Sequence, residues 1–173
     1  MPAFGVASAG AILVGDAIGH GLRERVWPIV RQTLVLTCIW MVSVGIVYIV
    51  FPGPLIGLFE SEVGASTELL KVGAVMLGLC GVWQLFDAIT MTFGEALRAA
   101  GDTAWPMAAR VILAWFVFTP LAWYAVMVWH GGVVTIMVSV IIYIAVLGAV
   151  LAYRFKSGRW RDIDLVEGDM PLL

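Results

Sequence analysis

Asp87 is the residue of this chain best suited to carry chemistry, because it is an acidic side chain inside a long apolar stretch. No lysine, arginine or histidine occurs between Val72 and Leu97. A carboxylate deep in a bilayer costs about 3 kcal/mol on insertion scales, so it must face protein or water. There it can bind a cation, carry a proton or hold a partner. We interpret Asp87 as functional; the alternative is an inward-facing carboxylate that neighbouring helices satisfy.

A polar helix face surrounds this carboxylate. The residues that share one side of a helix at 3.6 residues per turn are Trp83, Gln84, Asp87 and Thr90. We expect this face to line a cavity that binds a cation or a substrate. Asp87 would supply the charge, Gln84 a hydrogen-bonding neighbour and Trp83 an aromatic surface. The only ion expected at Asp87 is a sodium ion or a proton.

Glu95 and Asp16 are secondary candidates. Glu95 lies about two turns beyond Asp87 and Arg98 follows it at i+3, which favours an interfacial ion pair worth little to stability. Asp16 stands near the arginines of the next connection and is interpreted in the same way. The sequence holds no nucleophile–base pair, metal-ligand set or phosphate-binding loop. It therefore predicts no enzyme activity, no catalytic residue and no cofactor, and no nucleic-acid partner is expected.

The composition shows what must position these residues. Hydrophobic residues make up 62% of the 173 residues and charged residues 13%, whereas soluble domains are about 45–50% apolar and about 25% charged. About 20 apolar residues are needed to cross the hydrocarbon core of a bilayer. We therefore predict an all-α polytopic membrane bundle over residues 1–155 and a tail over 156–173. The five predicted transmembrane helices cover residues 2–18, 29–51, 69–97, 106–129 and 133–153.

The basic residues predict an orientation. Nine of the ten lysines and arginines fall in alternate connections or in the tail, and Lys71 alone falls on the opposite side. The positive-inside rule places the nine in the cytoplasm, so the first helix enters the membrane from outside. Tryptophans are expected to anchor the two interfaces. They are Trp27, Trp105 and Trp160 on the cytoplasmic side and Trp129 on the outer side.

Small residues and a proline predict local features of two helices. Gly15 and Gly19 lie four residues apart in the first predicted helix, a spacing that lets helix backbones approach closely in lipid. Pro120 lies inside the fourth predicted helix, where it removes a backbone donor and should kink the helix. The first apolar segment begins without a flanking loop, as expected if further sequence precedes it.

Several motifs resemble the multidrug and toxic compound extrusion (MATE) family. Residues 9–21, rich in small side chains with a Val-Gly pair, resemble the second helix of one half of that family. Phe86-Asp87-Ala88, followed by residues 94–103 and Pro106, is similar to the family signature in the tenth helix and the loop after it. Residues 154–161 also fit. The resemblance covers nearly the whole chain and matches helices eight to twelve of a twelve-helix transporter.

This resemblance implies a function. Members export cationic or amphipathic compounds in exchange for sodium ions or protons, and Asp87 matches a carboxylate implicated in cation coupling in one branch. The chain would form part of one lobe of a two-lobe transporter in a bacterial inner membrane, with a cytoplasmic C-terminus. Its partners would be the bilayer, the substrate and the missing N-terminal lobe. Asp16 departs from the family's usual glutamine, and Ala99 from its usual glycine.

Two alternatives stay open. A flippase for lipid-linked sugars, from the same superfamily, would carry a more basic central cavity, whereas the predicted spans hold Asp87 and no interior arginine. A non-transporting membrane subunit would tolerate the loss of the Asp87 charge. The substrate, the choice between sodium and proton, the oligomeric state and whether the chain is a fragment or a natural half-transporter do not follow from the sequence.

Overall fold

The computed structural model describes residues 2–57 and 67–163. Every regular element in this part of the chain is helical, and five helical segments are long and apolar enough to cross a membrane. The prediction of an all-α membrane bundle is confirmed. The elements are α1 (Pro2–Gly19), η1 (Arg23–Arg25), α2 (Val26–Val50), α3 (Pro52–Gly57), α4 (Thr67–Ala99), α5 (Ala104–Leu113), η2 (Ala114–Phe118), α6 (Thr119–Met127), α7 (Val133–Lys156) and η3 (Arg159–Asp162).

The helix ends differ from the sequence prediction by a few residues. Helix α2 begins three residues earlier than predicted, at Val26 rather than at residue 29, so Trp27 belongs to its first turn. Helix α7 runs three residues further than predicted, to Lys156. The connection between the second and third predicted spans contains Glu60 and Glu62, and these two residues lie outside the described part of the chain.

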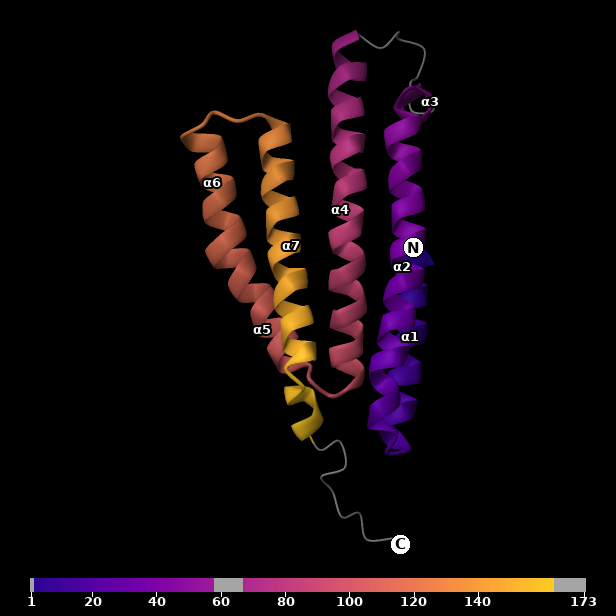
Figure 1. Ribbon diagram of the computed structural model, residues 1–173. Helices are drawn as coiled ribbons and strands as arrows, with labels where there is room; N and C mark the ends of the chain where they lie inside the picture. Colours follow the sequence, from indigo (N-terminus) through magenta and orange to yellow (C-terminus); the bar gives the residue numbers. More distant parts are fainter. Residues whose placement is uncertain (1, 58–66, 164–173) are drawn as a thin grey trace, which may run out of the picture.

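Helix α4 is the central element of the bundle. It packs against α2 on one side and α7 on the other and also contacts α1, while α5 and α6 lie along the far side of α7 (Figure 1). Glycines permit the closest approach of α2 and α4. A Cβ atom added at Gly45 would lie 3.1 Å from the carbonyl oxygen of Gly81. The two backbones are therefore in direct contact, as small residues allow in lipid.

The glycines of α1 behave differently from the sequence prediction. Neither Gly15 nor Gly19 has another part of the described structure within 4 Å of where a Cβ would stand. The close contact is made instead by Gly10, where a Cβ would overlap the Thr33 side chain of α2. Helical spacing identified a helix rich in small residues but not the face that packs.

The densest core lies at one end of the bundle, where α1, α4 and α7 end and α2 begins. It contains fully buried apolar side chains from all four helices, including Val14, Val26, Leu97 and Leu151. Trp160 of η3 completes it with only 3% of its surface exposed. The expectation that Trp160 is an interfacial anchor is therefore wrong, because η3 folds its ring back onto α7.

The fourth predicted span changes helix type in the middle. The segment η2 is a π-helical stretch that ends at Phe118, two residues before Pro120. Both the backbone N–H of Thr119 and its hydroxyl donate to the carbonyl oxygen of Ala114, the hydroxyl at 2.9 Å. The wider turn accommodates the missing proline donor, as π-helical turns commonly do inside helices. The proline thus marks a break in the regular helix, where the sequence predicts a kink.

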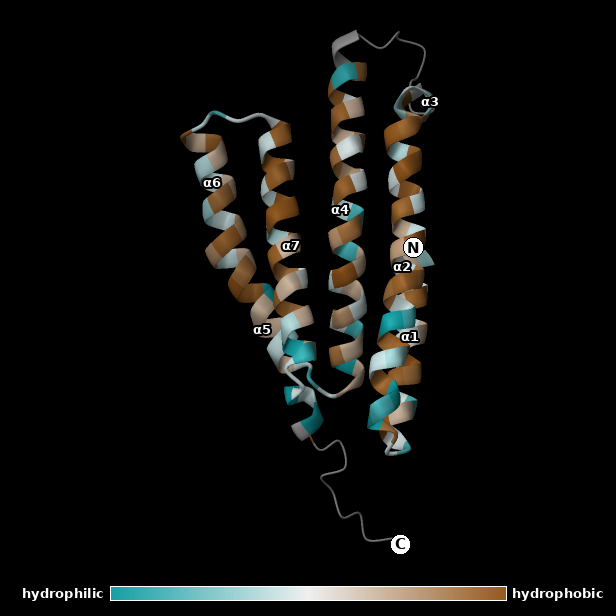
Figure 2. Cartoon of the chain, viewed as in Figure 1, coloured by the Kyte–Doolittle hydropathy of each residue, from teal (hydrophilic) through white to brown (hydrophobic). Residues whose placement is uncertain are grey.

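Basic residues gather at the end of the bundle that holds the dense core. Figure 2 shows hydrophilic residues concentrated there, while most helix surfaces are hydrophobic and suited to lipid. The arginines reach further into the helices than the sequence prediction placed them. Arg31 lies in the second turn of α2 and Arg110 in α5, rather than in the connections.

Candidate functional site

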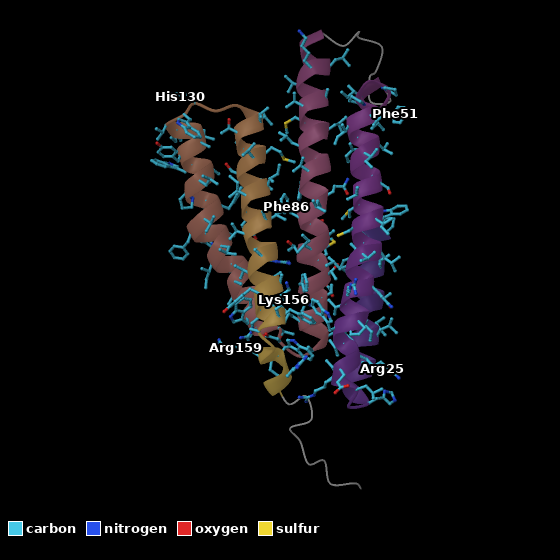
Figure 3. All side chains as sticks on the ribbon, in the orientation of Figure 1. Arg25, Phe51, Phe86, His130, Lys156 and Arg159 are labelled. Atoms are coloured by element: carbon cyan, nitrogen blue, oxygen red, sulfur yellow. The ribbon has the colours of Figure 1, made fainter. Side chains whose placement is uncertain are left out.

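Asp87 lies in the middle of α4. It precedes Ala99, the last residue of the helix, by twelve positions, which corresponds to about 18 Å along the axis. Its neighbour Phe86 lies near mid-height of the bundle (Figure 3). The Asp87 side chain is half-buried. Among the described residues, its carboxylate has no ion-pair partner within 4 Å. A carboxylate at this depth is free to accept a cation or a proton.

A pocket of about 390 Å³ opens between α1, α4 and α5, toward the basic end of the bundle. Helix α4 forms its floor, Phe4 of α1 one wall, and α5 the other wall. Gly94 is part of this floor, and a Cβ there would make ordinary contact with the Leu151 side chain at 3.8 Å. The lining side chains are Phe4, Thr90, Met91, Gly94, Glu95, Arg98, Thr103, Pro106, Met107 and Arg110.

Asp87 does not line this pocket, and neither do Trp83 and Gln84; Asp87 lies next to the lining residues on the same face of α4. Thr90, Met91 and Gly94 line the pocket and follow Asp87 at positions i+3, i+4 and i+7, so they share its face of α4. Asp87 is thus one helical turn further into the bundle than the lining residues. The Arg110 guanidinium of α5 is within electrostatic range of its carboxylate. The pocket and Asp87 are thus neighbours along one face of α4.

The three other residues predicted beside Asp87 have different environments. Trp83 and Gln84 are half-buried, and within the described structure the Trp83 indole N–H is buried without an acceptor. Thr90 is buried, and its hydroxyl can donate to the backbone oxygens of Phe86 at 3.0 Å and of Ile144 at 3.3 Å. Its hydroxyl therefore ties α4 to α7, while its side chain forms part of the pocket wall.

The secondary candidates both have nearby partners. Arg98 donates to the Glu95 carboxylate at 2.8 Å, which confirms the expected ion pair, and both residues line the pocket. Asp16 is exposed, and its carboxylate lies 3.3 Å from Nδ1 of His20, one turn further along the helix. Its expected arginine neighbours do not pair with it in the described structure. Asp16 lies outside the pocket.

Sequence reasoning missed Arg110 as a site residue. It was assigned to the connection before the fourth span, although its place within the predicted span 106–129 was a signal that it could lie inside the membrane. It also removes the argument that no arginine lines the interior. No cluster of three metal-ligating side chains was found among the described residues.

Comparison with known proteins identifies the family. The family model described as MatE matches residues 1–124. The chain belongs to the MatE family. Helices α1, α2 and α4 and the pocket beside Asp87 all fall within the matched part. The resemblance expected from the motifs is therefore confirmed, and the family is one of multidrug efflux transporters.

Curated relatives match most of this chain. The probable multidrug resistance protein NorM of Thermotoga maritima is 32% identical over 160 residues, which cover 92% of this chain and 34% of the relative. The protein of the same name from Caulobacter vibrioides is 27% identical over 163 residues, 94% of this chain and 34% of the relative. This chain thus spans about a third of the length of these relatives. No solved structure gives a significant match.

Proposed function

We propose that the chain is the C-terminal part of a cation-coupled antiporter that exports cationic or amphipathic compounds. The observation that carries this proposal is the position of Asp87, a half-buried carboxylate in mid-span, one helical turn beyond residues of α4 that line a pocket. The names of the curated relatives, which refer to multidrug resistance, support the same interpretation. The proposed location is a bacterial inner membrane, with the basic end of the bundle in the cytoplasm.

The proposed coupling is a competition at one carboxylate. Asp87 can hold a coupling cation or a proton, and it cannot bind either at full strength while a cationic substrate shares the site. The positive charge of Arg110 competes with the coupling cation, because its guanidinium attracts the same carboxylate. The coupling ion is sodium or a proton. Moving one charge through 100 mV supplies about 2.3 kcal/mol, equivalent to an accumulation ratio of about 50.

One observation favours a second candidate function. Arg98 and Arg110 both line the pocket, so the interior is more basic than the sequence suggested. A flippase for lipid-linked sugars would use such residues to hold an anionic headgroup. The two functions differ in their need for Asp87: cation export depends on its charge, whereas anion binding at the arginines does not.

The test uses a complete transporter that carries residues 1–173 as its C-terminal part. Asp87→Asn keeps the size of the side chain and removes its charge, so it should insert normally and lose ion-driven export of a cationic dye. The accumulation ratio at 100 mV should fall by up to about 50-fold. Glu95→Gln is the matched control, because it removes a charge in the same pocket that is already paired with Arg98. Its effect should be smaller.

Export is measured against imposed sodium and proton gradients at matched expression. If Asp87→Asn exports like the parent, Asp87 is a packed polar residue and either the flippase or the non-transporting subunit becomes the better interpretation. Retained export of an anionic lipid by the same variant would support the flippase.

A further inference from the structure

A second pocket lies at the basic end of the bundle, where α2 begins and α7 ends. Its volume is about 420 Å³, and it shares no lining residue with the pocket beside Asp87. Trp27 of α2 forms one side, and the turn from α7 into η3 forms the other. Both helices are membrane-spanning candidates that start or end here. The pocket therefore opens at the level where lipid headgroups meet water.

An aromatic wall backs this pocket. The ring of Phe155 stacks on that of Trp27 at 6.0 Å and on that of Trp160 at 5.5 Å, between ring centroids. The Trp160 indole N–H donates to the carbonyl oxygen of Phe155 at 3.0 Å, which holds its ring in place. Trp27 remains 44% exposed. An exposed indole at the end of a membrane span suits the boundary between acyl chains and headgroups.

Two cations complete the pocket. Lys156 and Arg161 line it, and both side chains are exposed. Gly158, with a φ of +73°, makes the left-handed turn that brings η3 back against α7 and so places both cations on one pocket. Arg23 donates to the backbone carbonyl of Arg161, which ties this turn to the connection between α1 and α2. None of the described side chains that line the pocket is acidic.

We propose that this pocket binds the phosphate group of an anionic phospholipid. Lys156 and Arg161 would hold the phosphate, and the lipid chains would run along the exposed face of Trp27 into the membrane. A basic pocket between membrane helices is the expected form of such a site. A free phosphate ester would satisfy the same cations but would leave the indole face unused, so the position of Trp27 favours a lipid. Figure 3 shows Lys156 and Arg25 at this same end of the bundle.

The test titrates the purified full chain in detergent micelles with brominated phosphatidylglycerol and with brominated phosphatidylcholine, and it follows the quenching of tryptophan fluorescence. The anionic lipid should quench at lower mole fraction than the zwitterionic lipid. Lys156→Gln together with Arg161→Gln should weaken the anionic preference about 25-fold, since each cation near the surface contributes about fivefold. Trp27→Phe should remove the component of quenching that saturates first.

Arg159→Gln is the matched control. It removes the same charge from the same turn, is exposed, and does not line the pocket. Its effect on the preference should be clearly smaller than that of either pocket cation, because its side chain does not line the pocket. If it weakens the preference as much as a pocket cation does, the effect is one of general surface charge and the site is refuted.

A competition experiment distinguishes a lipid phosphate from a free phosphate ester. Soluble glycerol phosphate at the concentration of the lipid should not relieve the quenching. Full relief would mean that the pocket takes a free phosphate ester and would overturn the lipid assignment. Far-UV circular dichroism of each variant before titration excludes loss of fold as the cause. The basic side chains that are substituted are solvent-exposed and lie at a helix end or beyond it, so the variants should keep the parent spectrum.

Discussion

Replacing Arg154 by leucine should lower the stability of the bundle more than replacing Arg98, the other arginine that pairs with a carboxylate among the described residues. The Arg154 Nε donates to the Asp102 carboxylate at 2.7 Å, and the two side chains are only 15% and 5% exposed. The guanidinium also lies over the Trp105 ring, 5.1 Å from its centroid. This ion pair joins the turn between α4 and α5 to the last turns of α7. It thereby fixes the helix that carries one wall of the pocket.

The expected loss of stability follows from how deeply this ion pair is buried. Removing one member of a buried ion pair typically costs about 3–5 kcal/mol, because the other charge is left without compensation. Arg154→Leu leaves Asp102, the more buried partner, without its counter-charge. Because this end of the bundle is near water, we expect the free energy of unfolding to fall by about 3 kcal/mol, the lower end of that range. Asp102→Asn should cost less, about 1–2 kcal/mol, because the amide oxygen still accepts and Trp105 still covers the guanidinium.

The control is the other arginine–carboxylate pair of the described residues. In this pair Arg98 is 61% exposed and Glu95 is 17% exposed. Both are more open to water than Arg154 and Asp102, so Arg98→Leu should cost less than Arg154→Leu, about 1 kcal/mol. Unfolding in mixed SDS and mild detergent, followed by far-UV circular dichroism, measures each cost. A double-mutant cycle of Arg154→Leu with Asp102→Asn should show a coupling energy above about 1 kcal/mol. Equal costs for Arg154→Leu and Arg98→Leu, or no coupling, would refute the reasoning.

Three further outcomes are expected. Gly45→Val should lower the stability by about 1–3 kcal/mol because it pushes against the backbone of α4, whereas Gly78→Ala, with open space around it, should not destabilise; thermal unfolding in detergent compares them. In intact cells, single cysteines at Arg25 and Arg159 should resist membrane-impermeant thiol reagents while one at Glu62 reacts, and the opposite pattern would reverse the proposed orientation. In reconstituted vesicles the chain alone should show no ion-driven efflux of a fluorescent cation, because the proposed transporter needs a cleft between two lobes and the chain spans about a third of its relatives' length; robust efflux would indicate a working oligomer.

The sequence by itself determined the properties that depend on local composition and spacing. Apolar length gave the five helices to within a few residues at their ends, since the cost of exposing backbone groups to hydrocarbon leaves helices as the simplest spanning form. The motif around Asp87 and residues 94–103 indicated the family, and the family match confirms it. The i+3 spacing of Glu95 and Arg98 predicted their ion pair, because helix geometry alone brings such residues together.

Only the tertiary structure decided which residues from different helices meet. The pocket beside Asp87 requires Phe4 and Arg110, whose positions in the sequence carry no record of each other. Trp160 is buried because a left-handed glycine turns η3 back onto α7, a contact that interfacial preference did not predict. Helical periodicity fixes which side chains share a face, but the packing of neighbouring helices decides whether that face meets lipid, protein or a cavity.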